Sequence, residues 1–167
     1  MTWSSTASSR ERILGALPYL LPLMEVSLLA LSYAVRYGLG LFAQFPLLQV
    51  VLVPISPLIR IYTSFPFAGL IIFILLLTLV VRNTNISRFI RFNTMQAILL
   101  DIVLILGQLI LNIVLLPIMG PNLVLDTLLN VVVLGIYAAV IYSLVQTGLG
   151  RYAEIPTISD AVNMQVR

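Results

Sequence analysis

Two uninterrupted apolar runs constrain the fold of this chain more than any other feature of its sequence. Residues 70–81 are apolar except for Thr78, and residues 97–106 are apolar except for Asp101. A membrane β-strand alternates apolar and polar residues, whereas continuous runs of this kind are typical of helices surrounded by lipid. The sequence therefore predicts an all-α membrane protein, because a helix satisfies its own backbone hydrogen bonds inside a bilayer.

Composition supports this fold class and narrows the chemistry. The chain is 60% hydrophobic and 9% charged, whereas an ordinary soluble domain carries about 25% charged residues. All nine basic residues are arginine, and the sequence contains no histidine or cysteine. Thiolate nucleophiles, histidine bases and soft metal sites are therefore excluded, and we expect no enzyme activity, no metal and no cofactor. The net charge of +3 comes from arginines beside apolar runs, which favours contact with lipid headgroups over nucleic acid.

The apolar runs divide one membrane domain, residues 1–167, into four predicted transmembrane helices. These spans cover residues 44–62, 67–81, 95–116 and 123–146, and short connections arrange them as two antiparallel hairpins. Residues 1–43 are expected to form an N-terminal tail with an interfacial helix. Residues 147–167 are expected to form a cytoplasmic tail.

The N-terminal apolar stretch, residues 13–35, has two possible arrangements. Ser8 and Glu11 have the spacing of a capping box, which predicts a helix that starts near Ser8. The stretch contains two prolines and Glu25, and an acidic group at the centre of a span costs about 2.5 to 3.5 kcal/mol. We therefore expect an amphipathic helix in the membrane interface, with a spanning helix as the alternative.

The arginine positions favour the same layout, because cytoplasmic flanks collect arginine. In the four-span layout only Arg60 lies opposite the termini. The arginines on the side of the termini are Arg10, Arg12, Arg36, Arg82, Arg88, Arg91, Arg151 and Arg167. A spanning helix over residues 13–35 would instead place Arg10, Arg12 and Arg60 opposite the other six. The stronger asymmetry predicts that both termini are cytoplasmic.

Polar side chains form a stripe on each of the last two predicted spans. The stripe residues are Asp101, Gln108 and Asn112 on the third span, and Asp126, Asn130 and Tyr137 on the fourth. Their spacing is close to whole helical turns, so each set shares one helix face. The two stripes could face each other and form a polar path for ions or polypeptide, or bind a partner. They could equally join helices by hydrogen bonds worth about 0.6 to 2 kcal/mol each.

A basic and aromatic segment follows the second predicted span. Its docking candidates are Arg82, Arg88, Phe89, Arg91 and Phe92. Interleaved arginine and phenylalanine are typical of an amphipathic element on the membrane surface. We expect it to contact headgroups or a partner, although membrane orientation alone could explain the arginines.

Several motifs resemble those of the Tic20 family, the membrane subunit of the protein translocon at the chloroplast inner envelope, and its cyanobacterial relatives. In order along the chain they are ALPYLLP (16–22), FPF (65–67), VVRN (80–83), RFIRFNTMQAILLD (88–101) and IPTISDA (155–161). The resemblance implies four transmembrane helices with both termini on one side. It also implies a core, channel-forming role in preprotein import, with translocon membrane proteins, lipids and polypeptide substrates as partners.

We therefore expect a non-enzymatic translocon subunit in which the polar stripes line the route of the polypeptide. The short segment before the first apolar stretch favours a cyanobacterial or plastid-encoded protein. Its membrane would then be the cyanobacterial plasma or thylakoid membrane, or the plastid inner envelope. The alternative function is an accessory or assembly subunit of a larger photosynthetic or respiratory complex, and a small ion or solute carrier is a third.

Overall fold

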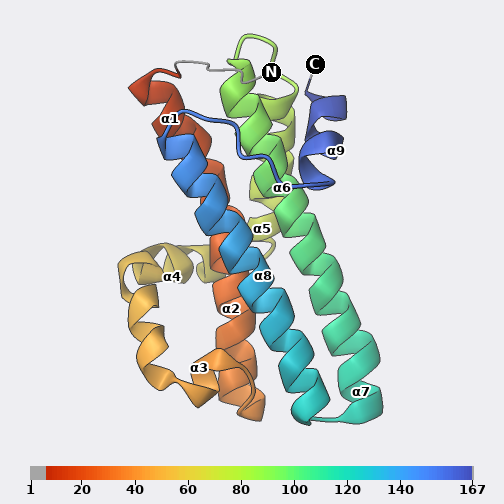
Figure 1. Ribbon diagram of the computed structural model, residues 1–167. Helices are drawn as coiled ribbons and strands as arrows, with labels where there is room; N and C mark the ends of the chain where they lie inside the picture. Colours follow the sequence, from red (N-terminus) through yellow and green to blue (C-terminus); the bar gives the residue numbers. More distant parts are fainter. Residues whose placement is uncertain (1–6, 167) are drawn as a thin grey trace.

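Across residues 7–166, which the computed structural model describes, every regular element is helical (Figure 1). Four stretches are long and apolar enough to cross a bilayer, namely Ser9–Tyr37, Pro46–Ser64, Arg88–Met119 and Leu123–Gly148. The predicted all-α membrane fold is therefore confirmed. The segments that compose it differ from the predicted ones. Arg167, which entered the arginine count, lies outside the described residues.

The first described helices form one long rod made of α1 (Ser9–Ala16), η1 (Leu17–Tyr19) and α2 (Leu20–Tyr37). The predicted capping box is present, with the Ser8 amide donating to Glu11 Oε2 at 2.8 Å and the Glu11 amide donating to Ser8 Oγ at 3.3 Å. The rod ends at Gly38, whose φ of 66° is the left-handed conformation that stops many helices.

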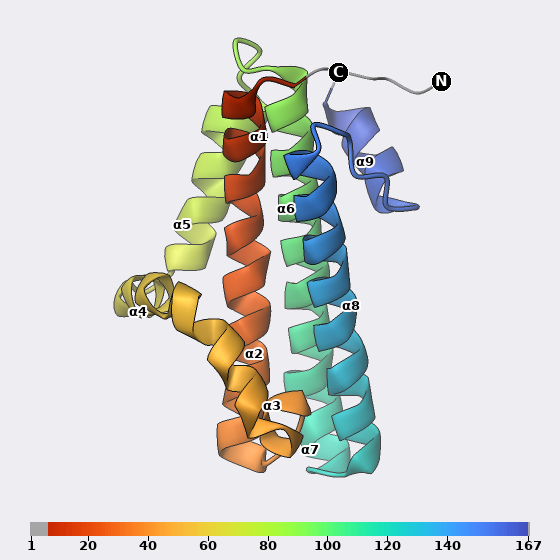
Figure 2. The ribbon, with the colours of Figure 1, turned by 60° about the vertical axis from the view of Figure 1, so that its left-hand side comes forward.

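This N-terminal rod lies inside the bundle, where α2 packs against both α6 (Arg88–Leu109) and α8 (Leu123–Gly148) (Figure 2). Its side chains Tyr19, Val26 and Tyr33 are fully buried. The structure therefore gives no support to the predicted interfacial helix. The prolines do not separate the rod, because Pro18 lies in the first positions of the 3₁₀ turn η1, where its missing N–H costs little.

The segment after the rod is broken into short pieces: α3 (Leu41–Gln44), η2 (Pro46–Ile55), α4 (Ser56–Ser64), α5 (Ala68–Leu75) and η3 (Leu76–Val81). Figure 2 shows η2 rising from one end of the bundle, α4 crossing at mid-height, and α5 continuing to the other end. Pro54 lies inside η2 and cannot donate a helical hydrogen bond, which explains the end of that element, and Pro57 lies in the first positions of α4, where a new helix can start.

Two separate spans over residues 44–62 and 67–81 were expected here. The apolar helix Ala68–Val81 is shorter than the roughly 20 residues that a span requires. Together with η2 and α4 it forms one discontinuous helical segment that runs from one end of the bundle to the other (Figure 2). The N-terminal rod is thus long and apolar enough to be a span, whereas of the two spans expected in the first hairpin only Pro46–Ser64 reaches that length by itself.

The second half of the chain follows the predicted order more closely. The helix α6 continues through the π-helical segment η4 (Ile110–Leu115) into α7 (Leu116–Met119). After a turn, Asn122 caps α8 by accepting a 2.9 Å hydrogen bond from the Leu125 amide. The helices α6 and α8 pack along each other (Figure 1).

The first and last described helices lie at the same end of the bundle (Figures 1 and 2). The last one, α9 (Ile158–Gln165), packs against α6 and buries Val162 beside Phe92. The expected polar tail therefore contains a docked helix. The described arginines at this end are Arg10, Arg12, Arg82, Arg88, Arg91 and Arg151, whereas Arg36 ends α2 at the opposite end.

Candidate functional site

Two of the predicted stripe residues on α8 hold the turn that follows the N-terminal rod. Asp126 accepts hydrogen bonds from the Gly40 amide at 2.5 Å and from Gln44 Nε2 at 2.6 Å. Asn130 accepts from the Leu41 amide at 2.9 Å. These bonds satisfy backbone amides that would otherwise be unpaired in an apolar setting, so both residues anchor the segment from α2 to α3.

Two further stripe residues bind the rod itself. The Tyr33 hydroxyl donates to Asn112 Oδ1 at 2.8 Å, and the hydroxyls of Ser27 and Tyr137 lie 2.8 Å apart. Within the described part of the chain, no hydrogen bond connects one stripe to the other. The hydrogen-bond partners of these four residues all lie on the rod or on the turn and short helix after it. The contacts observed for these four residues are helix-joining contacts.

A second polar cluster, which the sequence analysis did not identify, joins the rod to α6 and α8 nearer the termini. Asn93 Oδ1 accepts hydrogen bonds from the Tyr19 hydroxyl at 3.1 Å and from Thr147 Oγ1 at 2.7 Å, and all three residues are buried. One turn further along, Gln96 Nε2 donates to Ser143 Oγ at 3.1 Å. The three-residue and four-residue spacings of these pairs could have indicated two more polar faces.

The remaining two stripe residues, Asp101 and Gln108, have a different setting. Asp101 is only 2% exposed, and its Oδ1 atom has no hydrogen-bond partner among the described residues. It lines a cavity of about 250 Å³ together with Glu25 of α2 and Gly69 of α5. The Tyr62 hydroxyl of α4 donates a hydrogen bond to Glu25. Gln108 lies two turns along α6 and makes no hydrogen bond within residues 7–166.

This Asp101 cavity lies where α2, α5 and α6 meet, beside the break between α4 and α5. Its other lining residues are apolar: Leu70, Phe73, Ile102, Ile105 and Leu106. A buried carboxylate with an unpaired oxygen is costly, so it is usually retained where it contacts a ligand, water or a partner. The cavity is the polar feature of the bundle that packing explains least.

The basic and aromatic residues separate into two groups in the structure. Phe89, Arg91 and Phe92 are buried at the start of α6. Arg91 Nε donates to the Val81 carbonyl at 2.8 Å, and both phenylalanine rings contact Tyr152 edge-on. Three of the five predicted docking residues are therefore part of the fold. Arg82 and Arg88 are exposed, and Arg88 Nη2 donates to Asn163 Oδ1 at 3.4 Å.

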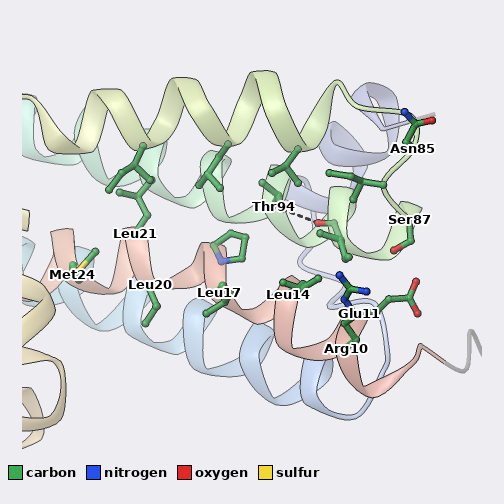
Figure 3. Close-up of a pocket in the computed structure, with 16 residues that line it drawn as sticks. Arg10, Glu11, Leu14, Leu17, Leu20, Leu21, Met24, Asn85, Ser87 and Thr94 are labelled. Atoms are coloured by element: carbon green, nitrogen blue, oxygen red, sulfur yellow. Dashed lines mark hydrogen bonds between the residues drawn. The ribbon is translucent and has the colours of Figure 1, made fainter.

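A larger groove runs between the N-terminal rod and the α5–η3 segment (Figure 3). Its volume is about 660 Å³. Figure 3 shows polar side chains gathered at one end, where Arg10, Glu11, Asn85 and Ser87 lie, and apolar side chains along the rest. The sequence analysis did not identify this groove, since its walls come from segments far apart in the chain.

Comparison with known proteins places these features in a family. The family described as "Chloroplast import apparatus Tic20-like" matches residues 6–162. A "Tic20 family protein" of Synechocystis is 50% identical over 100% of this chain and 99% of its own length. "Protein TIC 20-v, chloroplastic" of Arabidopsis thaliana is 35% identical over 96% of this chain and 73% of its own length. "Protein TIC 20-II, chloroplastic" of the same plant is 33% identical over 93% and 72%.

Proposed function

Because this chain belongs to the Tic20 family, we propose that it is a membrane subunit of a machinery that moves polypeptides across or into a membrane. Proteins of this family are translocon components and not enzymes. The observation that carries the proposal is the family match across almost the whole chain. The matched residues include the rod, the segment 46–81 and the buried polar residues of α6 and α8.

Within this function, we place the contact with polypeptide at the Asp101 cavity and Gln108. Four stripe residues have hydrogen-bond partners on the rod or the turn after it, whereas Asp101 Oδ1 and the Gln108 amide have none among the described residues. Polar groups of a passing chain could bind both. In the adjacent segment Pro46–Ser64 only Leu52 is buried, so few packing contacts oppose its displacement.

The termini are proposed to be cytoplasmic. Six described arginines flank the end of the bundle where α1 and α9 lie, against Arg36 at the other end, and positive residues collect on the cytoplasmic side. The similarity to a Synechocystis protein over the full length supports a cyanobacterial membrane, or the inner envelope of a plastid. Arg82 and Arg88 would then face cytoplasmic partners or headgroups.

A second function, an accessory subunit of a larger photosynthetic or respiratory complex, has one observation in its favour. Most of the polar groups inside the bundle are used for packing the chain's own helices, as a purely structural subunit would require. In that case the Asp101 cavity would be covered by a neighbouring subunit.

Purification of the full-length chain from its native membrane, combined with its depletion, separates the two functions. The translocon function predicts recovery with other membrane proteins of a translocation machinery and slower membrane passage of polypeptides after depletion. Recovery in fixed ratio with a photosynthetic or respiratory complex, together with undiminished polypeptide transport after depletion, would instead support the accessory function.

A further inference from the structure

The groove of Figure 3 has the shape and polarity of a site for one lipid molecule. Its walls are α1 and α2 on one side and the α5–η3 segment on the other. Apolar side chains line it from Leu14 down to Met24, and Leu17 is 51% exposed. An acyl chain can therefore enter from the surrounding bilayer without crossing a polar barrier.

The length of the groove corresponds to one leaflet. From Arg10 to Met24 the rod advances about 21 Å, at about 1.5 Å per residue. One leaflet with its headgroup region is about 20 to 22 Å thick, half of the whole bilayer. A bound polypeptide helix would need an apolar groove of about twice this length to cross the membrane, so the dimensions favour a lipid.

The polar end of the groove favours an anionic headgroup. The Arg10 guanidinium is exposed and makes no hydrogen bond or ion pair within residues 7–166. The neighbouring Glu11 carboxylate forms no ion pair with Arg10 among the described residues; it is held in the helix cap, where Oε2 accepts from both the amide and the hydroxyl of Ser8. The exposed Asn85 supplies a further amide at the same end. An arginine with an adjacent amide donor is a suitable partner for a phosphate group.

From this geometry we infer a specific site for a single anionic glycerophospholipid, with its phosphate at Arg10 and one acyl chain along α1 and α2. The site is separate from the Asp101 cavity. By filling the groove, the lipid packs the α5–η3 segment against the rod. The inference stands independently of any role in polypeptide transport.

Native mass spectrometry of the detergent-purified full-length chain tests this site. The chain is incubated with equal amounts of phosphatidylglycerol and phosphatidylcholine that carry the same acyl chains. We expect one retained phosphatidylglycerol on the unchanged chain. Arg10→Gln should lower the preference for phosphatidylglycerol about fivefold, which corresponds to one arginine near an anionic surface. Arg151→Gln, an exposed arginine at the same end outside the groove, should leave the preference unchanged.

A second pair of variants tests the apolar part of the groove. Leu17→Trp places a bulky ring in the groove and should reduce retention of both lipids, whereas Ile13→Trp alters an exposed residue that does not line it. Gel filtration of each variant verifies folding, which substitution of these exposed side chains should preserve. Equal loss of preference in Arg10→Gln and Arg151→Gln, or equal lipid retention by the two tryptophan variants, would overturn the site. Capture of a polypeptide in place of lipid by a photo-crosslinker at Leu20 would also overturn it.

Discussion

The backbone amide of Gly40 donates a 2.5 Å hydrogen bond to Oδ1 of Asp126, which ties the turn after the N-terminal rod to the first turn of α8. Gly40 has a φ of 88°, and a Cβ added there would lie 3.0 Å from Leu129 Cδ2. The turn therefore requires glycine both for its conformation and for its close approach to α8. The sequence pattern assigned Asp126 to a possible polar path, whereas its contacts show that it anchors a turn.

Removal of this anchor should destabilise the chain. Asp126→Ala leaves the Gly40 amide and the Gln44 side chain without their acceptor, and an unpaired buried donor costs about 1 to 3 kcal/mol. The free energy of unfolding, measured by SDS titration in detergent, should fall by that amount. Thr127→Ala is the control, because its hydroxyl bonds only to the Leu123 carbonyl of the same helix. Similar stability of the two variants would contradict the anchoring role.

The Ser27 and Tyr137 hydroxyls should be energetically coupled, since they lie 2.8 Å apart between α2 and α8. A double-mutant cycle with Ser27→Ala and Tyr137→Phe should give a coupling energy of about 0.6 kcal/mol, the average for hydrogen bonds between membrane helices. Tyr142→Phe combined with Ser27→Ala serves as the uncoupled pair, because the Tyr142 hydroxyl donates to the Glu154 carbonyl. A coupling energy of zero between Ser27→Ala and Tyr137→Phe would contradict a stabilising hydrogen bond between these two hydroxyls.

Asp101 should be the exception among the stripe residues. Asp101→Asn replaces a buried carboxyl that has an unpaired oxygen, so we expect unfolding stability equal to or above that of the unchanged chain. If the Asp101 cavity contacts polypeptide, the same variant should transport polypeptide more slowly. Functional sites commonly show this opposition of stability and activity. A clear loss of stability would instead assign Asp101 to packing.

The topology that the N-terminal rod implies differs from the predicted topology in the side of the membrane on which Tyr37 lies. If the rod spans the membrane and residues 46–81 cross back once, Tyr37 and Asn85 lie on opposite sides, whereas an interfacial rod followed by the two predicted spans would place both on the same side. The chain contains no cysteine, so single variants Tyr37→Cys and Asn85→Cys each carry one thiol. A membrane-impermeant maleimide should label one variant in sealed vesicles of one orientation and the other variant in inverted vesicles. Labelling of both in the same vesicles would contradict this arrangement.

Sequence patterns predicted the second half of the fold well and the first half poorly. The long apolar runs and the polar turn around residues 120–122 indicated α6, α7 and α8 because local hydrophobicity determines them. The rod was assigned to the interface because of Glu25. Its partner Tyr62 comes from α4, and no local pattern shows a tertiary contact that offsets the cost of an intramembrane acid.

The candidate site was predictable in part. Helical periodicity predicts one shared face of α6 for Asp101 and Gln108, although Gln108 is not among the residues that line the Asp101 cavity. The partners of Asn112 and Asp126 lie 79 and 86 residues away, so their packing role required the fold. Phe89 and Phe92 looked like docking residues because Tyr152, which covers them, follows α8. The walls of the groove in Figure 3 come from two separate segments, so no local sequence pattern could predict it.

Photo-crosslinking during transport tests the central claim, contact with a moving polypeptide, most directly. A photoreactive residue is placed at Ile105, which lines the Asp101 cavity, or at Gln108, with the exposed Ile141 of α8 as the control. With a labelled polypeptide arrested during membrane passage, adducts should form from the first two positions and not from Ile141. If the polypeptide crosses the membrane while all three positions give only lipid or intramolecular adducts, the proposed role of this face is wrong.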